Sequence, residues 1–189
     1  MGPIETIIRF EADREAATPR QQFDYADALR EVGRTRAALR IFLELESAPI
    51  PESKRHLVSL FKGATLQQMG RFREAEEAFR QACLLDATTT SRVHLAGLFA
   101  AQERFAEAID VLRAAVICEG NREEAYLNLA LNQRALGQLD EARQSLRLAL
   151  TLSPGYMAAR RMLTDIQAAL DLRELAEDAA RHGEKSRVG

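Results

Sequence analysis

The chain of 189 residues has no tryptophan, and it contains little glycine, proline or cysteine. With 10 Gly and 5 Pro, it lacks the turn residues that a many-stranded sheet requires, and runs of β-branched and aromatic residues are missing too. The residues that dominate are Ala, Leu, Arg, Glu and Gln, which all favour helices. The composition therefore predicts an all-α protein.

The cysteines are too few for a disulfide framework in a chain of this length. Cys83 and Cys118 both stand within apolar stretches of helical pattern, so we expect them to be buried free thiols. Free thiols persist in a reducing compartment, and no basic segment followed by an apolar run marks a secretory signal at the N-terminus. These features favour a cytoplasmic protein.

The chain also lacks an excess of charge of one sign and has no long apolar run. The 26 basic and 28 acidic residues are interleaved and give a formal net charge of −2. Because no positive field is available to neutralise phosphates, nucleic acid is not expected as a partner. No stretch reaches the roughly 18 apolar residues that a membrane-spanning helix needs, so no membrane contact is expected either.

Small residues recur at regular intervals along the chain. One column consists of Ala38, Ala75, Ala108 and Ala142, with spacings of 37, 33 and 34 residues. Four further columns keep the same spacings: Phe42, Phe79, Leu112 and Leu146; Leu45, Ala82, Ala115 and Ala149; Ala26, Gly63, Ala96 and Ala130; and Gly33, Gly70, Glu103 and Gly137. A sequence period of roughly 20–50 residues is typical of architectures in which each repeat stacks on its neighbours.

Local signals indicate that each repeat is a pair of helices. Thr18 offers a capping side chain, a proline follows in the first turn, and Gln21 completes a capping box. Asn121 and Glu124 stand in the same relation before the last complete pair. The glycine column falls between the two helices of each pair, where it suits the left-handed residue that ends a helix. Glu103 has to take that conformation without the freedom of glycine.

These columns resemble the tetratricopeptide repeat family, in four units over about residues 18–156. The unit with the fullest match carries Tyr126, Leu129, Ala130, Gly137, Leu139, Ala142, Leu146, Ala149 and Pro154. The other units depart from the family pattern at single positions, among them Thr35, Lys62, Arg92 and Gly120. The resemblance implies an all-α, right-handed superhelical solenoid of antiparallel helix pairs that serves as a protein–protein interaction module.

We expect one domain over residues 1–189, with a capping element at each end. The helix pairs are predicted at residues 18–52, 53–88, 89–122 and 123–156. Residues 3–17 are predicted to form an amphipathic N-terminal capping helix with Ile4, Ile7 and Ile8 on one side. Residues 157–183 form either a C-terminal capping helix or a decayed fifth pair, and residues 184–189 form a polar tail that we expect to be disordered.

Side chains suited to catalysis or metal binding are few and scattered. The three histidines show no metal-ligand spacing, and neither a glycine-rich phosphate loop nor a Cys-x-x-Cys motif occurs. Carboxylates are common, but Glu74, Glu107 and Glu141 recur beside the alanine of the second helix, and this repetition indicates a solvated outer face. We therefore expect no enzyme activity, no metal and no cofactor.

In the family that the repeats resemble, the first helices of successive pairs line a concave groove that accepts peptides or a helix. The equivalent positions here are Arg20, Phe23, Asp27 and Arg30; Leu57, Leu60, Ala64 and Gln67; Val93 and Gly97; Leu127, Leu131 and Arg134; and Arg161. The middle of this set is apolar, and charged residues stand at both ends. The resemblance thus implies a groove that binds an apolar or helical segment of another protein.

A carboxylate clamp, which chaperone-binding members of the family use to hold a C-terminal carboxylate, is not expected. Asn128 matches one clamp position, but the partner positions carry Val93, Gly97, Ala158 and Met162 in place of the Asn, Lys and Arg that the clamp requires. The sequence therefore argues against this mode of binding.

The leading hypothesis is an adaptor, scaffold or chaperone of bacterial type that binds another protein or peptide. Three alternatives stay open. The C-terminal helix, with Leu170, Leu172 and Leu175, packs into the groove of its own chain. The repeats pair with other copies and form a homo-oligomeric scaffold. The chain is an accessory domain of a larger enzyme.

Overall fold

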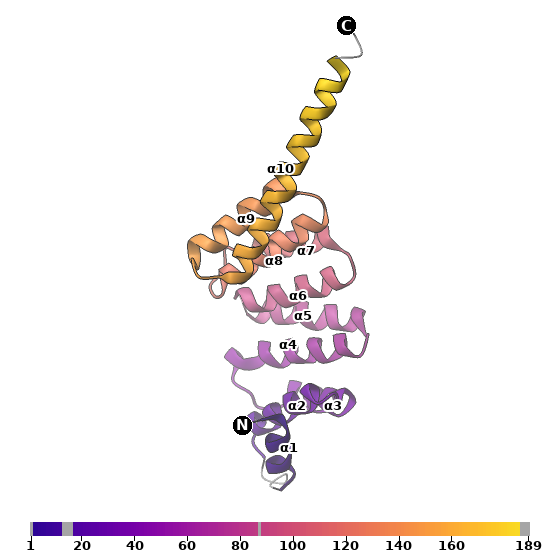
Figure 1. Cartoon of the computed structure of the whole chain (residues 1–189). Coiled ribbons are helices and arrows are strands. Elements are labelled where there is room, and N and C mark those ends of the chain that lie inside the picture. The colour runs from indigo at the N-terminus through magenta and orange to yellow at the C-terminus, as the bar shows by residue number, and fades with distance from the viewer. Residues whose placement is uncertain (1, 13–16, 87, 186–189) are drawn as a thin grey trace. The chain divides into compact units, whose positions relative to one another are not determined.

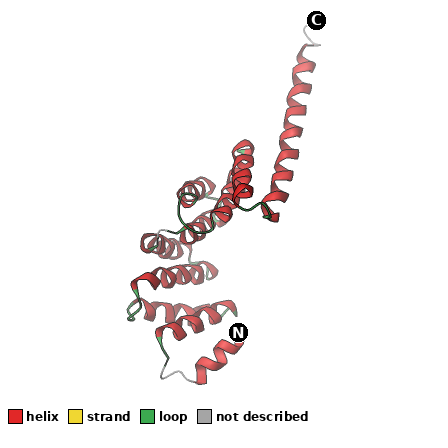
Figure 2. Ribbon diagram, turned by 90° about the vertical axis from the view of Figure 1, so that its left-hand side faces the viewer, coloured by secondary structure: helices red, strands yellow, loops and turns green. Residues whose placement is uncertain are grey.

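The computed structural model describes residues 2–12, 17–86 and 88–185, and all regular elements in these ranges are α-helices. Figure 2 shows these helices joined by loops. The prediction of an all-α protein is confirmed. The chain divides into two compact units, Met1–Leu98 and Phe99–Gly189, each with a hydrophobic core of its own. The expectation of one domain over the whole chain stays a prediction.

The first unit consists of consecutive helices, of which each of the first four packs against the next. They are α1 (Pro3–Ala12), α2 (Pro19–Glu31), α3 (Thr35–Glu46), α4 (Glu52–Gln68), α5 (Phe72–Leu85) and most of α6 (Thr89–Ala101). Contacts join α1 to α2, α2 to α3, α3 to α4 and α4 to α5, and Figure 1 shows α4 and α5 side by side. The first helices of two successive pairs, α2 and α4, also touch each other.

The core of the first unit depends on the repeated columns of small residues. Phe42 is fully buried there, beside Ala26 and Ala38. Gly63 allows a closer approach still, because a Cβ atom at this position would lie 2.7 Å from the Cδ1 atom of Phe79. The columns of small residues are thus the places where neighbouring helices come closest, as the repeat pattern predicts.

The turns within the helix pairs use left-handed backbone. Gly33, Gly70 and Gly137 have φ angles of 79°, 74° and 74°, and Glu103 takes the same conformation with a φ of 59°. The prediction that Glu103 occupies a glycine position is therefore confirmed. An ordinary side chain in this region clashes with the adjacent carbonyl, which costs about 1–2 kcal/mol.

Replacing Glu103 with glycine is expected to raise the free energy of unfolding by roughly 0.5–1 kcal/mol. The relief of backbone strain exceeds the stabilisation that glycine gives to the unfolded chain, which is itself about 0.5–1 kcal/mol. Urea unfolding followed by circular dichroism measures the change. Gly70→Ala is the matched control and should lower the stability by about 1 kcal/mol. Shifts of the same sign in both variants would contradict this account of the turns.

Side-chain caps begin the helices where the sequence predicts them. The amide N of Thr18 donates to Oε1 of Gln21 at 2.9 Å, and the amide N of Gln21 donates to Oγ1 of Thr18 at 3.4 Å. The amide N of Glu124 donates to Oδ1 of Asn121 at 3.3 Å. The capping box at the start of α2 and the cap at the start of α8 (Arg122–Ala135) are both confirmed.

The second unit is built from the end of α6 and four further helices. These are α7 (Phe105–Ala115), α8 (Arg122–Ala135), α9 (Leu139–Leu152) and α10 (Met157–Lys185). Contacts join α7 to α8 and α8 to α9, and α10 packs against both α9 and α8. Leu146, Ile166 and Leu170 form the centre of its core. Figures 1 and 2 both show α10 continuing well past its contacts with α8 and α9.

The N-terminal cap differs from the prediction. α1 covers Pro3–Ala12, and the predicted continuation over residues 13–16 lies outside the described residues. Ile7 packs against the core, but Ile4 and Ile8 are exposed. The expected apolar face of α1 is therefore used only in part.

The C-terminal end is a single helix rather than a helix pair. α10 is 29 residues long and continues through residues 184 and 185, so the predicted polar tail is wrong at its first two positions. A stretch without glycine or proline from residue 157 to residue 182 allows the helix to run on. The remaining residues of the predicted tail, 186–189, lie outside the described residues.

The two cysteines are free, as predicted, but neither is fully buried. Cys83 and Cys118 are both half-buried. The thiol of Cys118 donates to the carbonyl oxygen of Ala114 at 3.1 Å, one turn earlier in the chain. The expectation of buried thiols is therefore wrong in degree.

Candidate protein-interaction surface

Three of the predicted groove residues, Arg20, Phe23 and Leu57, meet at a pocket in the first unit. The pocket has a volume of about 420 Å³ and lies where the start of α2 faces the first turns of α4 and the loop before it. Its lining consists of Pro19, Arg20, Phe23, Asp24, Ile50, Pro51, Lys54, Leu57 and Val58. This cavity is called the α2/α4 pocket below.

Aromatic packing holds the floor of the α2/α4 pocket in place. The Phe23 ring packs edge-on against Phe42 and Phe61, with centroid distances of 5.6 and 5.0 Å. Because Phe42 is fully buried, Phe23 is anchored to the core while it still lines the pocket. Leu57 and Ile50 are half-buried and add apolar surface beside it. A rigid apolar floor of this kind loses little side-chain entropy when a ligand binds.

The rim of the α2/α4 pocket carries more positive than negative charge. Arg20 and Lys54 are exposed, and neither forms an ion pair within the described part of the chain. Asp24 is the one carboxylate among the residues that line the cavity. An apolar floor below a mainly positive rim suits an apolar ligand group that stands next to carboxylates.

Asp27 and Arg30, predicted to contribute charge to the groove, instead pair with each other. Nη2 of Arg30 lies 2.5 Å from Oδ1 of Asp27, and the guanidinium stands 5.5 Å from the centre of the Phe61 ring. This pairing lowers the charge that either residue offers to a ligand. The spacing of three residues on one helix is the sequence signal that could have predicted the pair.

Leu60 is not part of an exposed surface. Its side chain is buried at 4% exposure, because α4 is packed against α2, α3 and α5 at once. The prediction that Leu60 lines a groove is therefore wrong. Ala64 and Gln67, which follow on α4, are half-buried. On α6, Val93 is half-buried and Gly97 is exposed.

The predicted groove residues of the second unit lie on α8 and α10. Leu127 and Leu131 are half-buried, and Leu127 packs against the core that α8, α9 and α10 share. Arg134 and Arg161 are exposed. Packing within this unit thus uses part of the Leu127 side chain. Of the three leucines that the self-packing alternative named, Leu170 belongs to this core, whereas Leu172 and Leu175 are exposed.

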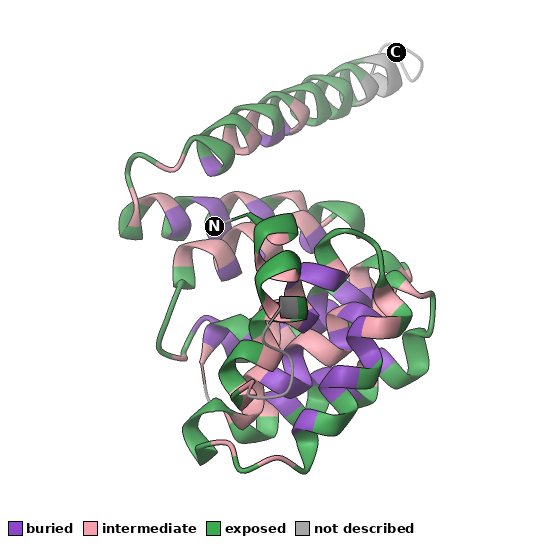
Figure 3. Cartoon of the chain, turned by 90° about the horizontal axis from the view of Figure 1, so that it is seen from below, coloured by how far each residue is buried: buried purple, intermediate pink, exposed green. Residues whose placement is uncertain are grey.

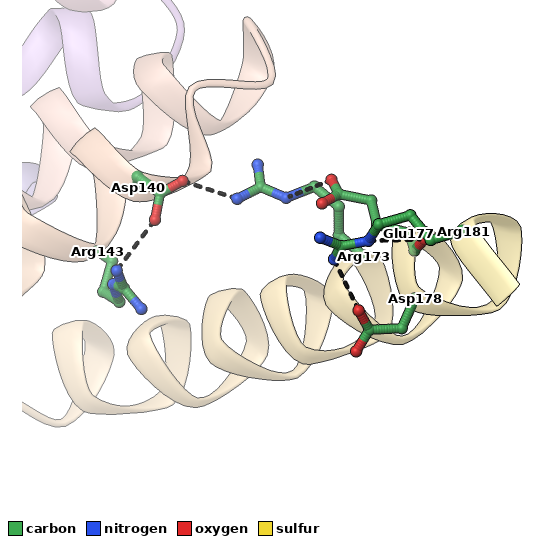
Figure 4. Close-up of polar contacts among 6 residues, drawn as sticks. All are labelled: Asp140, Arg143, Arg173, Glu177, Asp178 and Arg181. Atoms are coloured by element: carbon green, nitrogen blue, oxygen red, sulfur yellow. Dashed lines mark hydrogen bonds and ion pairs between the residues drawn. The ribbon is translucent and has the colours of Figure 1, made fainter.

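A charged cluster that the sequence did not reveal ties α10 to α9. Nη2 of Arg173 donates to Oδ2 of Asp140 at 2.8 Å, and Arg143 donates to the other carboxylate oxygen at 3.0 Å (Figure 4). The hydrogen bond from Arg173 is the main cause that lowers the pKa of Asp140, with a smaller contribution from Arg143. The same bond raises the pKa of Arg173. The two partners are 33 residues apart, so no local spacing predicts the pair.

The stability that Asp140 contributes should depend on pH. Since its pKa is lowered in the folded chain, this contribution is fully present above the unfolded value of about 3.9 and is lost as pH falls through the folded pKa. We expect Asp140→Asn to unfold at lower urea than the wild type at pH 7, and the difference to vanish in strong acid. A difference that stays the same at both pH values would contradict the pairing.

Other polar residues form a solvated outer face rather than a reactive cluster. Glu74 and Glu107 pair with Arg71 and Arg104, each at 2.6 Å, at equivalent positions of successive repeats. Within the ranges that the structure covers, no group of three His, Cys, Asp or Glu side chains is placed to hold a metal ion. None of the described helices combines the length and the apolar character needed to cross a membrane.

The paired helices, their left-handed turns and the pocket between two first helices define a helical repeat scaffold. Residues 57–88, which cover most of α4 and all of α5, match a tetratricopeptide repeat model. Residues 123–156, which cover α8 and α9, match a second such model with the bounds predicted for the fourth pair. These two matches show that the chain contains tetratricopeptide repeats, which support a protein-interaction module.

Solved structures share this fold. The C-terminal part of a TPR repeat-containing protein from Cytophaga hutchinsonii matches with a TM-score of 0.72 and 17% identity, over 90% of this chain and 66% of that chain. A crystal structure of MamA matches with a TM-score of 0.66 and 21% identity, over 85% and 86% of the two chains. The first TPR of Spaghetti (RPAP3), bound to an HSP90 peptide, matches with a TM-score of 0.58 and 25% identity, over 63% and 95%. A search of curated proteins found no match. The predicted solenoid fold is confirmed.

Proposed function

We propose that the chain is an adaptor or chaperone whose α2/α4 pocket binds an apolar or helical segment of a partner protein. The observation that carries this proposal is the pocket itself, with its anchored Phe23 and its half-buried Leu57 below an exposed Arg20 and Lys54. The tetratricopeptide repeat matches support it, and so does the peptide bound to the first TPR of Spaghetti. In this proposal the protein acts in the cytoplasm of a bacterium.

The apolar floor would supply the affinity, and the rim would set the orientation. A leucine-sized side chain gains roughly 1.5–3 kcal/mol when it is fully buried, before the ordering costs of binding are subtracted. Arg20 and Lys54 stand at the mouth of the cavity and would attract acidic residues next to that side chain. An amphipathic helix with an apolar stripe and acidic flanks meets both demands.

A C-terminal chaperone peptide is not the ligand that we propose. Asn128 matches one position of the carboxylate clamp, but its Nδ2 donates to the carbonyl oxygen of Glu124 at 2.9 Å. The next polar residue on this face, Asn132, donates in the same way to the carbonyl of Asn128 at 2.8 Å. These amides are used within α8, and the Lys and Arg partners of a clamp are missing from the sequence positions that should hold them.

Leu57→Glu should abolish partner capture while the protein keeps its helicity. The substitution removes apolar surface from the floor and places a carboxylate there, which repels the acidic residues proposed for the ligand. The test compares the proteins that tagged wild type and variant retain from a bacterial lysate, quantified by mass spectrometry, with circular dichroism as the check on folding.

Leu84→Glu is the matched control for this experiment. Leu84 lies on α5 in the same unit and is 82% exposed, so the same change of charge there leaves the pocket intact. We expect Leu84→Glu to capture what the wild type captures. If Leu57→Glu also captures the same proteins in the same amounts, the α2/α4 pocket is not the binding site.

A further inference from the structure

The helix α10 has two opposite apolar faces, and only one of them is covered. With about 100° of rotation per residue, Ile166 and Leu170 share the face that packs on α8 and α9. Leu172 and Leu175 project from the opposite face and are 67% and 66% exposed. A stripe with spacings of four and three residues continues this second face: Ala168, Leu172, Leu175 and Ala179. These four residues are called the tail stripe below.

The part of α10 that carries the tail stripe has little support from its own unit. Every residue from Asp171 to Ala179 is exposed, and Figure 3 shows this end of the helix in green. The Arg173–Asp140 pair ties this segment back to α9. An isolated helix of this length is marginal in water, and exposed leucines in a row are typical of an interaction surface.

Carboxylates flank the tail stripe. Asp171 and Asp178 follow one edge of it, seven residues apart on the same side of the helix, and Asp165 lies near the other edge. Arg173 is turned toward Asp140 of α9, whereas Arg181 pairs with Asp178 and offsets part of its charge, so Asp165 and Asp171 are the main acidic residues beside the stripe. The free face of α10 is therefore apolar in the middle and acidic beside it.

The α2/α4 pocket has the opposite charge pattern. Phe23 and Leu57 give it an apolar floor, and Arg20 and Lys54 stand at its mouth with no ion pair to any residue that the structure describes. An amphipathic helix with acidic flanks is the ligand that the pocket suits, and the tail stripe is such a helix within the same sequence. We propose that the tail stripe of one copy docks into the α2/α4 pocket of a second copy. This inference rests on the proposed function, since both use the same pocket.

Such a contact joins two different surfaces and can repeat from copy to copy. A head-to-tail contact of this kind closes into a ring or grows into a filament. Each added copy buries two leucines and leaves a new tail stripe free at one end. The wild type therefore associates in steps that depend on its concentration, and added salt weakens the association because it screens the charged rim.

Sedimentation velocity over a range of protein concentrations tests this inference. The wild type should form species larger than a dimer as its concentration rises. Leu172→Glu/Leu175→Glu, which removes the tail stripe, and Leu57→Glu, which blocks the pocket, should each raise the dissociation constant by at least about tenfold. Both leucines of the first variant are exposed, so that variant keeps its fold, and Leu84→Glu should associate like the wild type.

Mixing the two variants gives the sharpest result. The intact pocket of the tail variant accepts the intact tail stripe of the Leu57→Glu variant, so the mixture should form a dimer of one copy of each and nothing larger. A wild type that stays monomeric at every concentration overturns the inference, as does a tail variant that associates like the wild type. Dimers of the Leu57→Glu variant alone would mean that two tail stripes pair with each other, which also overturns it.

The outcomes separate this inference from the proposed function. The tail variant keeps the α2/α4 pocket, so it should still capture a different partner protein in the lysate experiment even if self-association is lost. Loss of capture in Leu57→Glu together with a monomeric wild type refutes docking of α10 and leaves the pocket as a site for another protein. Normal capture by Leu57→Glu refutes the pocket itself.

Discussion

Phe42→Ala is expected to lower the free energy of unfolding by roughly 3–5 kcal/mol. The ring is fully buried in the core of the first unit, where it fills the space beside Ala26 and Ala38. Its removal leaves a cavity that these small neighbours cannot fill. Phe23 also rests on this ring, so the α2/α4 pocket loses part of its floor in the same variant. Thermal and urea unfolding measure the loss.

The neighbouring residue supplies the control for this prediction. Leu43 is adjacent in sequence but half-exposed, at 51%, on the outer side of α3. We expect Leu43→Ala to change the stability by no more than about 0.5 kcal/mol. Equal losses in Phe42→Ala and Leu43→Ala would show that the repeated column is not the core of this helix pair.

Leu146→Ala should cost roughly 2–5 kcal/mol in the second unit. Leu146 belongs to the same repeated column as Phe42 and is fully buried between α8, α9 and α10. The matched control is Leu148→Ala, two residues further along α9 and 41% exposed, for which a loss below about 1 kcal/mol is expected. Urea unfolding at equal protein concentration compares the two variants.

The position of each destabilisation should also be visible by hydrogen exchange. In stacked repeats each helix pair contacts only its neighbours, so a cavity loosens nearby helices before distant ones. Phe42→Ala should speed exchange first in α2, α3 and α4, and Leu146→Ala first in α8, α9 and α10. The same pattern of faster exchange in both variants would contradict two separate cores.

The sequence predicted the fold well because the repeated columns record contacts that every helix pair makes. Ala38 and Gly63 stand where helices come close, and Glu103 takes the left-handed conformation of the glycines in its column. Such contacts recur at a fixed spacing, so one sequence shows them several times. The ends of the chain have no such repetition, and the length of α10 and the partial use of α1 were predicted less accurately.

The candidate site was predicted only in part, because a pocket depends on contacts between repeats. Arg20, Phe23 and Leu57 were found from their register, but the other residues that line the pocket, among them Ile50 and Lys54, were missed. Ile50 and Lys54 lie in or just after the loop between the first two helix pairs. The repeat spacing across this loop is 37 residues, three longer than the spacing of 34 between the last two pairs, so the register does not carry across the loop.

Two further differences come from packing that a helix pattern cannot show. Leu60 looked equivalent to exposed positions, but three helices surround α4 and bury it. The pairing of Arg173 with Asp140 joins two helices that are remote in sequence. Both the burial of Leu60 and the Arg173–Asp140 pair depend on which helices lie next to one another, and the pattern within a single helix does not show this.

The central claim is that the α2/α4 pocket binds protein. Hydrogen exchange of the wild type with and without its captured partner tests this claim most directly. The account predicts slower exchange in the first turns of α2 and α4 and in the loop that holds Ile50, with α5 unchanged. Protection confined to α5 or to the outer face of α9, with none at the α2/α4 pocket, would contradict it.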